Sequence, residues 1–127
     1  MATISTPKNL YIHYKEESVA RTDTSAKDLF VLPAGSTPLA LLIRGETASN
    51  AGTTAVLDVG ITGTAEYFIA DTSVLAAGGG ASSNFKPMLK GRTQLTTDTT
   101  VTATYAESGT ASTVGGPWTV GIFYIRA

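Results

Sequence analysis

Hydrophobic and polar residues alternate with a period of two along several parts of the chain, a pattern typical of half-buried β-strands. The clearest case is residues 54–62, and the same period returns at 100–105 and 118–125. The side chains predicted to face the core are Ala55, Leu57, Val59, Ile61, Val101, Ala103, Tyr105, Trp118, Val120, Ile122 and Tyr124. Those predicted to face solvent include Thr100, Thr102 and Thr104. The pattern therefore predicts strands in the middle and the last third of the chain.

Shorter apolar runs predict the other strands. Near the N-terminus, Leu10, Ile12 and Tyr14 would share one strand face, with Tyr11 and His13 on the other. Further strands are predicted at 29–32, 39–43, 67–69, 85–89 and 92–96, separated by turn signals such as Pro33–Ser36, Gly63 and Gly91. Strands spaced by about ten residues indicate an all-β fold, an antiparallel β-sandwich or jelly roll of about eight strands.

The helical signal is confined to residues 71–77, where Asp71 would cap one or two turns and Gly78 would end them. The glycine-rich tract 78–83 is predicted to be a loop. Residues 1–8 are polar, contain Pro7 and show no period, so we expect an N-terminal arm followed by a single β-sandwich domain at 9–127.

Composition supports the all-β prediction and removes several function classes. The chain has 127 residues with 21 Thr, 10 Ser, 13 Gly and no Cys, which excludes a disulfide framework and thiolate metal sites. The net charge is −1 and the basic residues are spread along the chain, so no nucleic-acid partner is expected. The longest apolar run, Leu39–Ile43, is too short to cross a bilayer, and the N-terminus lacks a signal-peptide core. We expect a soluble protein with no membrane partner.

Candidate catalytic residues are few. His13 is the one histidine, so a two-histidine metal site is impossible and any catalytic triad must include it. The carboxylates considered for acid–base chemistry or a calcium site are Asp58, Glu66 and Asp71, but the spaced acidic loop of a calcium-binding motif is missing. The sequence predicts no enzyme, no metal and no cofactor.

Two features of the sequence are compatible with ligand binding, but each also has a structural explanation. The glycines at 78–80 are followed by Ser-Ser-Asn and not by the Lys-Ser or Lys-Thr of a phosphate loop. Trp118 and the tyrosines would offer stacking faces to sugars, although their places on alternating strands favour core packing. A small carbohydrate-binding module stays open as an alternative.

Some predicted strands are apolar on both faces. Residues 29–32, 39–43 and 118–125 carry hydrophobic side chains on each side, whereas a sandwich needs only one buried face per sheet. The surplus predicts a cover by a second copy or a larger partner surface, with Phe123 and Ile125 as interface candidates. Cover by edge loops of the same subunit is the alternative.

Three segments carry a resemblance to a known family. They are residues 53–69 (TTAVLDVGITGTAEYFI), 99–105 (TTVTATY) and the closing strand 116–124 (GPWTVGIFY), with a glycine-rich insert between the first two. Over about residues 50–126 the chain resembles small virion proteins of tailed bacteriophages, in particular capsid decoration, or cement, proteins.

The resemblance implies a β-sandwich or jelly-roll protomer that forms a homotrimer on the outside of an icosahedral capsid. Its partner would be the major capsid protein of the same virus, and it would stabilise the mature shell after assembly in the bacterial host cytoplasm. Ile4 and Pro7 in the arm join Phe123 and Ile125 as predicted subunit or capsid contacts. A tail, neck or fibre component is the alternative within the virion.

Overall fold

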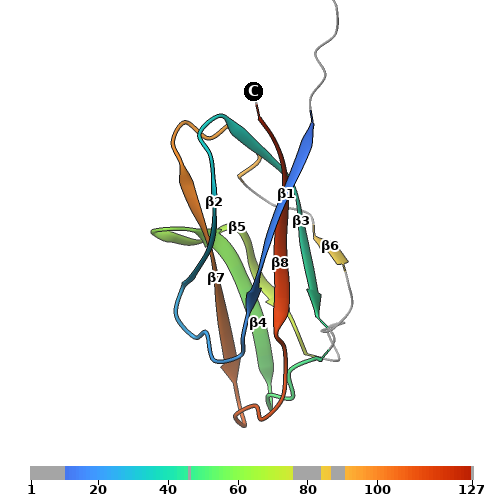
Figure 1. Ribbon diagram of the computed structural model, residues 1–127. Helices are drawn as coiled ribbons and strands as arrows, with labels where there is room; N and C mark the ends of the chain where they lie inside the picture. The colour runs from blue at the N-terminus through green and yellow to red at the C-terminus, as the bar shows by residue number, and fades with distance from the viewer. Residues whose placement is uncertain (1–10, 46, 76–83, 87–90, 127) are drawn as a thin grey trace, which may run out of the picture.

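The computed structural model describes residues 11–45, 47–75, 84–86 and 91–126, and these residues form two antiparallel sheets packed face to face (Figure 1). The strands are β1 (Ile12–Val19), β2 (Lys27–Leu32), β3 (Ser36–Gly45), β4 (Thr54–Ile61), β5 (Thr64–Ser73), β6 (Asn84–Lys86), β7 (Thr99–Ser108) and β8 (Trp118–Arg126). The predicted all-β sandwich is confirmed. The described ranges contain no helix, and so none that could span a membrane.

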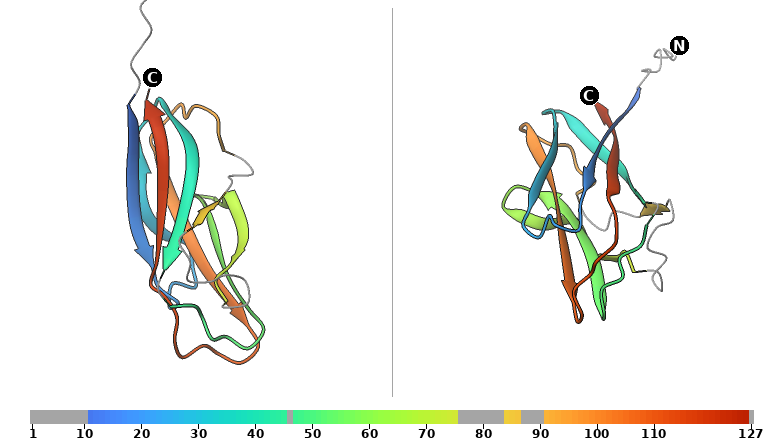
Figure 2. Two further views of the ribbon diagram at one scale, coloured as in Figure 1. Left: turned by 90° about the vertical axis from the view of Figure 1, so that its right-hand side faces the viewer. Right: turned by 60° about the horizontal axis from the view of Figure 1, so that its bottom comes forward.

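Strand order shows that chain neighbours seldom pair. One sheet has the order β1-β8-β3-β6 and the other β2-β7-β4-β5 (Figure 2). The first and last strands, β1 and β8, pair along their whole length from Ile12 opposite Ile125 to Val19 opposite Trp118. The two termini of the sandwich therefore belong to one sheet, and β1 forms its edge.

The core confirms most of the predicted inward positions. Fully buried side chains include Ala55, Leu57, Val59, Val101, Ala103, Tyr105, Trp118, Val120 and Ile122. Tyr105 and Trp118 stack across the two sheets with ring centroids 5.3 Å apart. Burial of these large apolar surfaces is the main favourable term in folding. Ile61 is the exception, because it lies at the β4 end and is only half-buried.

The predicted helical turn at 71–77 is wrong over its described part. Residues 71–73 end β5, and beyond them the Val74 amide donates to the Ala55 carbonyl at 2.8 Å while Leu75 bridges to Ser49. Pairing with distant segments satisfies this backbone, and it outweighs the local capping signal of Asp71. Residues 76 and 77 lie outside the described ranges.

Three other predictions need correction. Residues 92–96 form no strand, and only Leu95 there is buried, exchanging backbone hydrogen bonds of 2.8 Å with Gly35 and Ser36. Strand β1 runs to Val19, beyond the alternation at Leu10–Tyr14 on which its prediction rested. Thr102 was predicted to face solvent, yet it is 2% exposed beside a depression that the β4–β5 turn lines.

Candidate functional site

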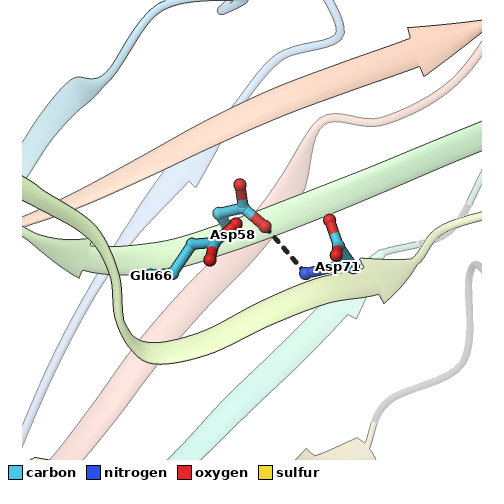
Figure 3. Close-up of side chains that lie close together, drawn as sticks. All are labelled: Asp58, Glu66 and Asp71. Carbon is cyan, nitrogen blue, oxygen red and sulfur yellow. Dashed lines mark hydrogen bonds between the residues drawn. The ribbon is translucent and has the colours of Figure 1, made fainter.

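The structure brings together the three carboxylates singled out in the sequence. Asp58 lies on β4 and Glu66 and Asp71 lie on β5, with carboxylate oxygens within 4.8 Å of one another (Figure 3). Asp58 is half-buried and the other two are exposed. We call these three residues the acidic cluster.

A β-bulge creates the acidic cluster. The pairing register passes from Leu57 opposite Thr72 to Val59 opposite Ile69, which leaves one extra residue on β5. Asp71 takes up the bulge at a φ of 52°, a left-handed conformation that aspartate tolerates better than most residues. Its amide consequently donates to Asp58 Oδ1 at 2.7 Å.

The acidic cluster offers the oxygen ligands that hard cations prefer, but two of its three carboxylates are exposed to solvent. Calcium takes six to eight oxygen ligands, and carboxylates are the commonest of them. Exposed acidic groups on a strand surface also occur without any ion. The expectation that the protein holds no metal therefore stays a prediction.

His13 lies away from the acidic cluster. It is on β1, in one sheet, whereas Asp58, Glu66 and Asp71 lie on β4 and β5 of the other. The imidazole stacks on Tyr124 with ring centroids 5.2 Å apart. This separation gives no support to a catalytic triad built from His13 and these carboxylates.

Sugar stacking on Trp118 is also unsupported. The Trp118 ring is fully buried against Tyr105, so it cannot offer a face to a sugar. Tyr124 is 5% exposed, which leaves Tyr11 at 76% as the most exposed aromatic side chain among the described residues. The core-packing prediction is confirmed for Trp118, Tyr105 and Tyr124.

The predicted interface residues Phe123 and Ile125 lie on the outer face of the β1-β8-β3 sheet. Cross-strand partners share a sheet face, and the register pairs Phe123 with Tyr14 and Ala40, and Ile125 with Ile12 and Thr37. Ile12 is 67% exposed and Leu39, in a bulge of β3, is 38% exposed. We call Ile12, Tyr14, Leu39, Ala40, Phe123 and Ile125 the outer apolar face.

Tyr14 extends from the edge strand β1 over β8 on this face. Its ring contacts Phe123 at a centroid distance of 4.5 Å and lies across Gly121, where a methyl group would overlap the tyrosine hydroxyl. The Tyr14 hydroxyl donates to Glu16 Oε2 at 2.7 Å, and Arg44 Nη2 donates to both Glu16 oxygens at 2.9 and 3.0 Å. A charged network therefore closes one end of the outer apolar face.

These contacts shift the ionisation of the network. Burial, followed by the hydrogen bond to Glu16, raises the pKa of Tyr14 to about 12. The hydrogen bonds from Tyr14 and then from Arg44 lower the pKa of Glu16. Both shifts keep the donor hydroxyl protonated and the acceptor carboxylate charged, which holds the Tyr14 ring against Gly121.

The remaining predicted contacts, Ile4 and Pro7, lie outside the described residues.

Two lysines were not predicted to have a role. Lys15 Nζ donates to the Val31 carbonyl at 2.7 Å, and Lys27 Nζ donates to the Ser18 carbonyl at 2.8 Å. No sequence pattern distinguishes these two lysines, because their partners are backbone groups of another strand.

Comparison with known proteins gives matches at the level of structure. No protein-family model and no curated protein matches the sequence. A chain of the cyanophage Pam1 capsid asymmetric unit matches with a TM-score of 0.69 and 22% identity, over 99% of this chain and 94% of that chain. A chain of the Ralstonia phage GP4 capsid matches with a TM-score of 0.65 and 16% identity, over 99% and 92%.

A third match comes from the acidic stable capsid structure of Helicobacter pylori bacteriophage KHP30. Its TM-score is 0.64 at 15% identity, over 93% of this chain and 88% of that chain. At these identities the likeness shows a shared fold. Because each alignment covers nearly all of both chains, the matched proteins are of similar size and not large subunits that contain such a domain.

Proposed function

We propose that this protein is a non-enzymatic structural component of a bacteriophage virion, which binds the outside of the capsid as a trimer and stabilises the mature shell. The observation that carries the proposal is the shared fold with small chains of three phage capsid structures, over nearly the whole of both chains. The partner would be the major capsid protein, and assembly would take place in the cytoplasm of the bacterial host.

The outer apolar face supports self-association. Its aromatic and aliphatic side chains are continuous across β1, β8 and β3, and none of these strands is covered by a helix in the described ranges. Exposed apolar surface of this kind marks contact sites between proteins. We assign the outer apolar face to the contact with a second copy in the trimer.

A trimer suits a stabilising role for a physical reason. Three linked copies bind with high effective concentration after the first contact, so modest single contacts give a stable complex. A protein that binds the mature shell better than its precursor shifts the equilibrium toward the mature shell by that difference in affinity.

The test compares particles of the encoding phage made with and without this gene. Purified protein added to deficient particles should co-sediment with them at a fixed ratio to the capsid protein, and it should raise the temperature at which DNA is released. Unchanged heat resistance together with no co-sedimentation would overturn the proposal. Binding to isolated tails in place of capsids would favour the tail, neck or fibre alternative.

A further inference from the structure

The exposed edges of the two sheets lie next to each other at β1 and β2. Each is the first strand of its sheet, and two lysines join them from opposite sides. Lys15 of β1 donates to the Val31 carbonyl of β2, and Lys27 of β2 donates to the Ser18 carbonyl of β1. Lysine is a common means of preventing strand addition at a sheet edge.

This protection covers only one end of β1. The Ser18 carbonyl accepts from Lys27, and the Ser18 amide donates to Glu17 Oε1 at 2.9 Å, so both groups point away from β8. In an antiparallel strand every second residue points the same way. The amides and carbonyls of Ile12, Tyr14 and Glu16 therefore point outward too, and no partner for them is present among the described residues.

The open part of the edge, Ile12–Glu16, adjoins the outer apolar face. Ile12 and Tyr14 belong to both, and Ile12 is largely exposed. A strand added here would gain main-chain hydrogen bonds and would place alternate side chains beside Ile12 and Tyr14. The site therefore fits an extended segment that can form a strand.

The chain itself supplies such a segment. Residues 2–6 read Ala-Thr-Ile-Ser-Thr, of which three are β-branched, and Pro7 cannot donate to a strand ladder and so would end the pairing. Ten residues precede Tyr11 and span up to about 33 Å when extended. Residues 7–11 contain no Gly and no Asn-Gly or Asp-Gly pair, which disfavours a tight hairpin back onto the same chain.

We propose that residues 2–6 of one copy pair as a strand with the open edge Ile12–Glu16 of a second copy. The inference rests on the trimer of the proposed function. Each copy gives one arm and receives one, which is a heterologous contact that closes into a ring when repeated by a three-fold rotation. Ile4 then packs beside the outer apolar face, and the bond from Lys27 to the Ser18 carbonyl confines the added strand to the N-terminal half of β1.

Cross-linking between two single-cysteine variants tests this pairing directly, because the chain has no cysteine of its own. Untagged Ile4→Cys protein is mixed with size-tagged Ile12→Cys protein, and in parallel with size-tagged Glu16→Cys protein, and each mixture receives a short bismaleimide. We expect a mixed dimer on denaturing gels from at least one mixture. The matched control is Ile4→Cys with Ala111→Cys, in the β7–β8 connection, which should give none.

Two outcomes overturn the proposal. One is no mixed dimer above the Ala111→Cys control. The other is cross-linking confined to single chains of the Ile4→Cys/Ile12→Cys double variant, which would mean that the arm folds back on its own β1. The assay uses no capsid, so mixed dimers without capsid binding would leave the arm exchange standing and remove the capsid role. Capsid binding without mixed dimers would keep the capsid role and remove the arm exchange.

A proline substitution gives a second, independent readout. Glu16→Pro removes an outward amide that β8 does not use, whereas Glu16→Ala keeps this amide and loses the same ion pair with Arg44. We expect Glu16→Pro to raise the trimer dissociation constant by about tenfold over Glu16→Ala, the size of one or two lost hydrogen bonds. Equal dissociation of the two variants in a light-scattering dilution series would contradict the proposal, provided that both show the sandwich circular dichroism spectrum.

Discussion

The two outer surfaces of the sandwich have the same strand period but opposite chemistry. On the β1-β8-β3 sheet the outward positions include Ile12, Tyr14, Phe123 and Ile125. On the β2-β7-β4-β5 sheet the outward pairs of β4 with β7 are small or polar, namely Thr54 with Ser108, Val56 with Ala106 and Asp58 with Thr104, while Val31 on β2 is 44% exposed. The inner faces of both sheets are equally apolar. The difference agrees with the proposal that the outer apolar face, and not the polar surface, forms the contact with a second copy.

Charge added to the outer apolar face should have the largest effect. The double variant Phe123→Glu/Ile125→Glu places two carboxylates on adjacent outward positions of β8, where they would have to be desolvated in a subunit contact. We expect the proposed trimer to dissociate into monomers while the fold is kept. Light scattering over a dilution series measures the change.

The matched control adds the same charge to the other surface. Thr54→Glu/Val56→Glu also changes an outward i, i+2 pair on one strand, and we expect it to leave the oligomeric state as it was. Equal oligomeric states for the two double variants would show that the surfaces do not differ in function.

Packing of Tyr14 over Gly121 gives the next largest effect. A methyl group at Gly121 would overlap the tyrosine ring, so Gly121→Ala must displace the ring from β8. We expect a loss of about 1–3 kcal/mol in the free energy of unfolding, as for other overpacked sites. Urea denaturation measures it, and the same substitution in a Tyr14→Ala background should cost much less. An equal cost in both backgrounds would show that Tyr14 is not the cause.

The sequence predicted the inner faces well and the outer surfaces poorly, for a physical reason. Burial of Leu57, Tyr105 and Val120 follows from the two-residue period, because any antiparallel sandwich must bury one face of each strand. The role of Gly121 depends on Tyr14, more than a hundred positions earlier, and only the pairing of β1 with β8 brings them together. Strand order of this kind is not encoded in local patterns.

The acidic cluster, too, depends on strand pairing that local sequence patterns do not encode. Asp58, Glu66 and Asp71 were recognisable as candidate carboxylates, but the acidic cluster depends on a bulge at Asp71 where local signals predicted a helix cap. The polar residues after Tyr14 carried no strand signal, because an edge strand such as β1 need not be apolar. Phe123 and Ile125 were predicted to face away from the core because strand 118–125 is apolar on both faces, and the structure places them there.

Alkaline pH should reduce the contribution of Tyr14, on the outer apolar face, to the free energy of unfolding. Because the pKa of Tyr14 is raised to about 12 from the ordinary value of 10.0, the folded state favours the neutral phenol. This contribution to stability is fully present below pH 10 and is lost as the pH rises through the folded pKa of about 12. We expect Tyr14→Phe to lose part of the alkaline decline in the free energy of unfolding between these values. An identical decline in wild type and variant would contradict the contact with Glu16.

The smallest effect is expected at the acidic cluster on the polar surface. Glu66→Gln removes one of three carboxylates that lie within 4.8 Å of one another, and it relieves repulsion between exposed like charges. We expect a gain of about 0.2–0.5 kcal/mol in the free energy of unfolding at low ionic strength, which disappears in about 1 M salt because the charges are screened. Urea denaturation at the two salt concentrations measures both values. The opposite result would be a Glu66→Gln variant that is less stable than the wild type, with added calcium stabilising the wild type but not the variant. That result would show that the carboxylates share a cation and that the polar surface carries a site of its own.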